Sequence, residues 1–209
     1  VGSEMCIRDR LKSLAQYADY PDDVKGLLGE MFAAVTMVAD NLKFSGAVSL
    51  QSKGDGALTR SLAECRDQHY LRGIAHVATD KAADIRSSNL ADWLGNGQLA
   101  LSLLPDKSTR MNPYQGLVEI DPAGLAASLE GYFQNSEQLQ TRLHFASLDG
   151  TTTGLLLQRL PDAPEASEVS IAAADDDWLT LTTLAASVTT EELATLAPKQ
   201  MLLLSLIHI

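Results

Sequence analysis

The sequence has few cysteines and no long apolar run. Its 209 residues contain two cysteines, Cys6 and Cys65, which are too few and too far apart for a disulfide framework or the paired cysteines of a zinc site. A reducing compartment fits this usage, so we expect a cytoplasmic protein. No run is long enough to cross a bilayer, and a start containing Glu4, Arg8 and Arg10 is not typical of a signal peptide. We expect a soluble protein without a membrane partner.

Positive charge is also scarce. The chain has 16 Lys and Arg residues against 27 Asp and Glu residues, and its formal net charge is -11. This charge repels phosphate backbones, and no cluster of Lys or Arg provides a local exception. Nucleic acid is therefore excluded as an expected partner.

What the chain does have is an ordinary globular composition, with 45% hydrophobic and 21% charged residues. A chain of this size buries about 70% of the surface that it exposes when unfolded, enough for one main domain. We predict a core domain over residues 11–160 and a helical linker region over 161–203. Residues 1–10 show no periodicity that leads into the rest, and residues 204–209 end abruptly, so both ends look like foreign or artefactual sequence. The alternative for the C-terminal end is an amphipathic helix beginning near Pro198.

A helix is predicted after Pro21, because Asp22 and Asp23 suit a helix N-terminus. Apolar residues then recur at steps of three and four, which is the spacing of one buried helical face. Gly26 and Gly29 lie inside this helix, where each lowers helix stability relative to alanine. We therefore expect them to allow close approach of another element. The residues on the buried face are Val24, Leu27, Leu28, Met31, Val35, Val38 and Leu42.

Beyond Gly46 the apolar period changes to two, which predicts strands. The turn at 54–56 predicts a hairpin, and further strands are expected at 71–77, 99–103, 114–120, 141–145 and 154–160. Pro122 is expected to open a helix whose Leu125, Leu129, Tyr132 and Phe133 share one face. A last helix is predicted within the linker region, with Asp175 to Asp177 at its solvated N-terminus. The fold class is α+β, with mostly antiparallel sheets packed with helices and a small C-terminal helical segment.

No reactive group stands out in the sequence. Cys65 lies at a strand end, where a buried small apolar residue is a better interpretation than a nucleophile. His69, His76 and His144 show no metal-ligand spacing, so no metal site is expected. The glycines at 54–56 and 95–97 do not open helices, and we interpret them as turns that need a positive φ. The chain is therefore not expected to be an enzyme. The alternative is a small-molecule enzyme on an α+β scaffold that uses Cys65 or a histidine.

A set of short stretches, in one order along nearly the whole chain, carries a family resemblance. They are Tyr20-Pro21, Leu42-Lys43-Phe44-Ser45-Gly46, Gly54-Asp55-Gly56, Cys65 with Arg72-Gly73, Gly95-Asn96-Gly97, Tyr114-Gln115-Gly116, Tyr132-Phe133, Ser136-Glu137-Gln138-Leu139, Gly154-Leu155-Leu156-Leu157-Gln158 and Glu191-Glu192-Leu193. With these residues the chain resembles the heat-shock protein 33 family, or 33-kilodalton chaperonins, over residues 11–203.

The resemblance implies an ATP-independent, redox-regulated chaperone, a holdase that binds unfolding proteins under oxidative or heat stress. Homodimers are implied as well. In the family, four C-terminal cysteines hold zinc, and their oxidation expels the metal and uncovers apolar surface. Those four cysteines are absent from this sequence, so we expect neither a cofactor nor the zinc-binding domain in this chain. Gln140 stands where the family usually has proline.

Tyr114, Tyr132, Phe133 and Leu139 are the candidates for contact with client proteins. They are apolar or amphipathic and lie close to turns that the family shares. The alternative for Tyr132 and Phe133 is core packing, because they continue the apolar stripe of a helix.

Overall fold

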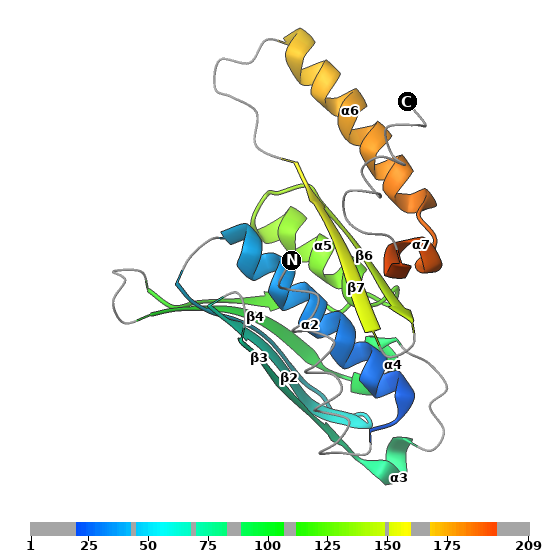
Figure 1. Cartoon of the computed structure of the whole chain (residues 1–209). Coiled ribbons are helices and arrows are strands. Elements are labelled where there is room, and N and C mark those ends of the chain that lie inside the picture. Colours follow the sequence, from blue (N-terminus) through cyan, green and yellow to red (C-terminus); the bar gives the residue numbers. More distant parts are fainter. Residues whose placement is uncertain are drawn as a thin grey trace.

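Helix α2 (Asp22–Leu42) is the central element of the structure, a computed structural model (Figure 1). The predicted first turn is present, and the predicted apolar face is buried except at Leu42, which is 44% exposed. The structure describes residues 20–42, 45–67, 70–82, 89–106, 112–148, 151–159 and 168–195. The predictions for 1–10 and 204–209 lie outside these residues.

A five-stranded antiparallel sheet, here called sheet A, covers one side of α2 in the order β3-β2-β1-β4-β5. The predicted hairpin is the β1–β2 pair, with Leu50 opposite Ala63. The α+β class is confirmed. The strands of sheet A are β1 (Gly46–Lys53), β2 (Leu58–Arg66), β3 (Tyr70–Val77), β4 (Gln98–Pro105) and β5 (Tyr114–Val118).

The two glycine turns predicted separately lie against each other. The Gly56 N–H donates to the Leu94 carbonyl at 2.8 Å, and the Asp55 carboxylate accepts from the Asn96 N–H at 2.8 Å. Of these turn glycines only Gly95 has a positive φ, +64°. The prediction of a positive φ was wrong for the turn at 54–56, where a Cβ on Gly54 would instead lie 2.2 Å from the Leu94 carbonyl oxygen. Close backbone approach explains that glycine.

Sheet A buries alternate residues against α2. Val48, Leu50 and Leu101 are at most 4% exposed, and all belong to the same core as Phe32 of α2. Gly73 of β3 allows this packing, since a Cβ there would lie 2.5 Å from Cζ of Phe32. The period of two along the strands therefore selects the face that meets the helix.

A second, two-stranded sheet lies on another side of α2 and consists of β6 (Thr141–Leu148) and β7 (Thr151–Gln158). Gly29 permits this contact, because a Cβ there would lie 2.1 Å from Oγ1 of Thr152. The expectation of close approach is confirmed for Gly29. It was wrong for Gly26, where a Cβ would have no neighbour within 4 Å.

Helix α5 (Leu125–Ser136) carries the predicted stripe, and Leu125, Leu129, Tyr132 and Phe133 are all buried. Its predicted start at Pro122 was wrong. Gly124 has a φ of 118°, outside the helical range, and the Asp121 carboxylate accepts from the Ala123 N–H at 2.7 Å to form a turn. The helix begins after this turn.

The remaining helices are short or peripheral. They are α3 (Thr79–Ala82), α4 (Leu90–Leu94), α6 (Glu168–Ser187) and α7 (Thr190–Thr195). The linker region is helical where it is described, but Asp175 to Asp177 lie within α6 and not at its N-terminus. The alanine-rich sequence before them has a high helix propensity, which lets the helix begin earlier. The predicted boundaries of the core domain and the linker stay predictions.

No described helix is both long enough and apolar enough to span a membrane.

Candidate functional site

Three of the four predicted contact residues line one cavity of about 180 Å³. Tyr114 comes from β5, and Tyr132 and Phe133 come from α5. The other walls come from α2, β4 and β7, so the cavity lies where both sheets meet the two main helices. Its aliphatic lining consists of Val38, Leu42, Leu101, Leu103 and Leu156. We refer to this site as the apolar cavity.

The polar atoms of the apolar cavity are largely paired with one another. The hydroxyls of Tyr132 and Tyr114 donate to Oε1 of Glu137 at 2.8 and 3.0 Å, and the two hydroxyl oxygens lie 3.0 Å apart. Burial raises the pKa of Tyr132, and the hydrogen bonds with Tyr114 and Glu137 raise it further. Tyr132 is therefore a neutral hydrogen-bond donor and not an acid or base at physiological pH.

Tyr132 and Phe133 form the inner wall of the cavity. They are 4% and 8% exposed, and their rings meet edge to face with centroids 5.6 Å apart. Gly116 makes room for Tyr132, since a Cβ at Gly116 would lie 2.4 Å from the Tyr132 hydroxyl oxygen. The interpretation of both aromatic residues as core is confirmed, and they also line the cavity.

The mouth of the apolar cavity carries exposed apolar side chains. Leu42 and Tyr114 are both 44% exposed. Asn41 and Gln158 border the cavity too, and Nδ2 of Asn41 donates to Oε1 of Gln158 at 2.6 Å. Sequence reasoning placed Leu42 only on the buried helical face. Its position at the last residue of α2, where cover from a neighbouring element ends, was the available signal.

Leu139 does not line the apolar cavity. It is half-buried, and its backbone N–H donates to the Phe133 carbonyl at 3.0 Å. Gln138 just before it has a φ of 57°, which turns the chain after α5 toward β6. Leu139 therefore belongs to the turn that ends α5, although its sequence position near Tyr132 suggested a shared surface.

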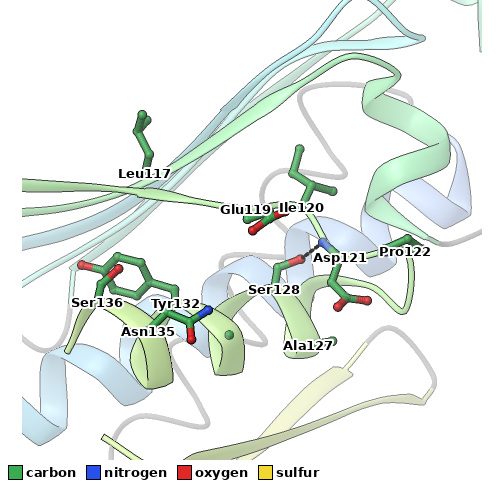
Figure 2. Close-up of a pocket in the computed structure, with 11 residues that line it drawn as sticks. Leu117, Glu119, Ile120, Asp121, Pro122, Ala127, Ser128, Tyr132, Asn135 and Ser136 are labelled. Carbon is green, nitrogen blue, oxygen red and sulfur yellow. Dashed lines mark hydrogen bonds between the residues drawn. The ribbon is translucent and has the colours of Figure 1, made fainter. Parts of the chain in front are cut away.

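A second cavity lies on the other side of Tyr132, between β5, the loop after it and α5 (Figure 2). Its volume is about 350 Å³, and we call it the α5–β5 groove. Leu117 and Glu119 border it from the strand side, and Ser128 and Asn135 from the helix side. Oγ of Ser128 accepts from the Asp121 N–H at 2.9 Å, which fixes the loop to the helix.

The face of sheet A turned away from α2 carries exposed apolar residues on its two edge strands. On β3 these are Tyr70 and Ile74, 66% and 43% exposed, and on β5 it is Leu117, 69% exposed. Between them Glu64 is 3% exposed, and Arg72 donates to its carboxylate at 2.8 Å. The apolar exposure of this face is therefore concentrated at its edges.

Cys65 is a core residue. It is 1% exposed, and burial raises the pKa of its thiol to about 11. The buried-residue interpretation is confirmed, and Cys65 is removed as a candidate nucleophile. His76 is exposed on β3, and His144 has a buried Nε2 without a hydrogen-bond partner among the described residues. His69 lies outside the described residues.

Glu30 is an acid that sequence reasoning missed. It lies in the middle of α2, borders a cavity of about 330 Å³ together with Asn89 and Gly124, and is half-buried. Burial raises its pKa to about 7. Glu30 is flanked by apolar residues of α2, and Asn89 and Gly124, which border the same cavity, are far from it in the sequence.

The part of the chain that the structure describes contains no cluster of three or more His, Cys, Asp or Glu side chains able to hold a metal ion. No step below involves a metal.

Comparisons with known proteins give the family of this α+β chain. A family model described as Hsp33 protein matches residues 5–208. The chain belongs to the Hsp33 family, which confirms the resemblance seen in its short sequence stretches.

Curated relatives carry the name 33 kDa chaperonin. The protein of Shewanella denitrificans is 33% identical over 201 residues, which cover 96% of this chain and 65% of the relative. The protein of Pseudomonas syringae pv. syringae is 39% identical over 178 residues, which cover 83% of this chain and 55% of the relative. The chain therefore spans about two thirds of the length of these relatives or less.

A solved structure shares the fold. The crystal structure of the 33 kDa chaperonin (heat shock protein 33 homolog) from Thermotoga maritima matches with a TM-score of 0.71 over 93% of this chain and 66% of that chain. The sequence identity is 16%, so this likeness shows the fold alone.

Proposed function

We propose that this chain is the client-holding part of an ATP-independent, redox-regulated chaperone that binds unfolding proteins under heat or oxidative stress. The observation that carries the proposal is the apolar cavity, into which Tyr114, Tyr132 and Phe133 converge and whose mouth exposes Leu42. The names of the relatives support the proposal.

The apolar cavity suits unfolded segments because of its size and chemistry. A volume of about 180 Å³ accommodates one or two large side chains but not an extended small-molecule substrate. Its exposed aliphatic and aromatic rim gains free energy when a client covers it, at about 25 cal/mol per Å² of apolar area. The hydroxyls of Tyr114 and Tyr132 already donate to Glu137, so an apolar client segment that covers the cavity leaves neither hydroxyl without a partner.

The proposal needs no reactive group in the described residues. The alternative enzyme loses its strongest candidate, because the Cys65 thiol is buried and protonated. This sequence has two cysteines, fewer than the four that the family resemblance implies for redox regulation. The redox part of the proposal therefore rests on the resemblance alone. A cytoplasmic location and a homodimer remain parts of the proposal that follow from the family.

The direct test is to heat an aggregation-prone client with the purified 209-residue chain, without nucleotide, and to record light scattering. We expect scattering to fall in proportion to added chain, up to about one chain per client. Undiminished aggregation at equal concentrations would overturn the proposal. Addition of ATP is the control and is expected to leave the trace unchanged.

A further inference from the structure

β5 is an edge strand of sheet A. It ends the strand order, and within the described ranges β4 is its only strand neighbour. An edge strand presents backbone N–H and C=O groups with which another extended chain can pair. Proteins often protect such edges with charge or proline, but Tyr114–Val118 contains neither. The strand is therefore suited to accept a further strand.

The α5–β5 groove runs beside this edge (Figure 2). Helix α5 forms its opposite wall, and Gly131 leaves that wall open, since a Cβ at Gly131 would meet no atom within 4 Å. Leu117 borders the groove, but its side chain points away from α5 (Figure 2) and is 69% exposed. A chain paired with β5 would place alternate side chains in the groove and beside Leu117, because side chains alternate along a strand.

The charges at the groove have one sign. Glu119 and Asp121 border it, both exposed, while Ser128 and Asn135 contribute neutral polar groups and none of its lining residues is basic. The whole chain carries a net charge of -11, which adds to the attraction for cations. Charge complementarity therefore favours Lys or Arg side chains on the groove side of a bound strand.

We propose that the edge of β5 and the α5–β5 groove together bind an extended client segment in which apolar and basic side chains alternate. The segment pairs with β5, places its apolar side chains beside Leu117 and directs its basic side chains toward Glu119 and Asp121. This inference rests on the proposed function and names the class of client segment. The site is separate from the apolar cavity, although Tyr132 borders both.

The test uses two fluorescent peptides of equal length, one alternating Val with Lys and the other alternating Val with Glu. Anisotropy titration at low salt is expected to give the Lys peptide about tenfold higher affinity or more, and added salt should reduce the difference. Hydrogen exchange with the Lys peptide bound should slow at residues 114–118. Equal affinities for the two peptides, or slowed exchange only elsewhere, would overturn the inference.

Variants place the binding at the groove. Gly131→Leu fills open space, so it should weaken the Lys peptide about tenfold while thermal unfolding is unchanged or higher, whereas Gly131→Ala should bind within about twofold of wild type. Glu119→Lys should weaken it about three- to tenfold, and Asp177→Lys, an equal charge change on exposed α6, should not. If one of the two variants, Gly131→Leu or Glu119→Lys, is unstable, the other decides the test. Wild-type affinity for the Lys peptide in each variant that folds would overturn the inference.

Client light scattering on the same preparations separates this inference from the proposed function. Wild type that suppresses aggregation but does not discriminate between the peptides would overturn the groove inference alone. Groove-dependent binding of the Lys peptide by protein that leaves aggregation undiminished would overturn the proposed function and keep the peptide site.

Discussion

Helices α2 and α6 are almost equal in length, 21 and 20 residues, but their surroundings are opposite. α2 lies between sheet A and the β6–β7 hairpin, while α6 projects beyond that hairpin (Figure 1). Phe32 of α2 is fully buried, whereas Leu179 of α6 is 65% exposed. Apolar residues on α2 repeat at one face, while those on α6 are spread around the helix. Arrangement, and not apolar content, decides which helix enters the core.

The largest effect that distinguishes the helices should come from removing a buried ring. Phe32→Ala deletes a side chain that is 0% exposed and packs against Gly73, so we expect it to lower the free energy of unfolding by about 3–5 kcal/mol. Leu179→Ala on α6 should lower it by less than about 0.5 kcal/mol. Urea unfolding followed by circular dichroism measures both. Equal losses would mean that α6 is packed as α2 is.

Two glycines within α2 should give effects of opposite sign. Gly29→Ala brings a Cβ within 2.1 Å of Oγ1 of Thr152, so it should destabilise by about 1–3 kcal/mol. Gly26→Ala meets no atom within 4 Å and removes backbone entropy from the unfolded state, so it should stabilise by about 0.5–1 kcal/mol. Thermal unfolding of both variants checks this pair. Stabilisation by Gly29→Ala would show that α2 and β7 are not in close contact.

Glu30 should make the stability of α2 depend on pH. Its folded pKa of about 7 lies above the ordinary value of 4.5, so the folded state binds more protons between these values. Stability should be fully present below about pH 4.5, fall as the pH rises toward 7 and stay low above it. Glu30→Gln should therefore stabilise the protein at pH 8 by about 1–3 kcal/mol and have little effect at pH 4.

The control for Glu30 is Asp176→Asn, because Asp176 is exposed on α6. It should change the free energy of unfolding by less than about 0.5 kcal/mol at either pH. Urea titrations at the two pH values measure both variants. A pH-independent effect of Glu30→Gln would contradict the burial of this carboxyl group.

Sequence patterns predicted the elements of this fold better than its site. The three- and four-residue steps from Val24 gave α2, and the period of two gave the strands, because each pattern follows from local geometry. The start of α5 was missed because the left-handed Gly124 and the side chain of Asp121 form a turn where Pro122 suggested a helix. Local side-chain hydrogen bonds of this kind leave no periodic signal.

The candidate site depends on contacts that a linear pattern does not contain. Tyr114 and Tyr132 are 18 residues apart and meet only because β5 and α5 pack side by side at Gly116. Their residue types suggested a contact surface. Leu139 was chosen for the same reason, but it belongs to the turn that ends α5 and does not line the cavity. The other walls, from α2 and β7, enter through tertiary packing alone, and so does the environment of Glu30.

The smallest expected effect concerns client binding at the end of α2. Leu42 is 44% exposed at the mouth of the apolar cavity, and Leu179 is 65% exposed on α6. If clients cover the cavity, Leu42→Ser should weaken client binding by about 1 kcal/mol, or about fivefold in the concentration that halves aggregation. Leu179→Ser changes the same residue type and should have no effect, although it removes more exposed apolar surface. Because both sites are exposed, neither change should lower the unfolding free energy by more than about 0.5 kcal/mol. Equal losses of client binding would mean that clients recognise exposed leucine in general, whereas a loss confined to Leu42 assigns binding to the cavity.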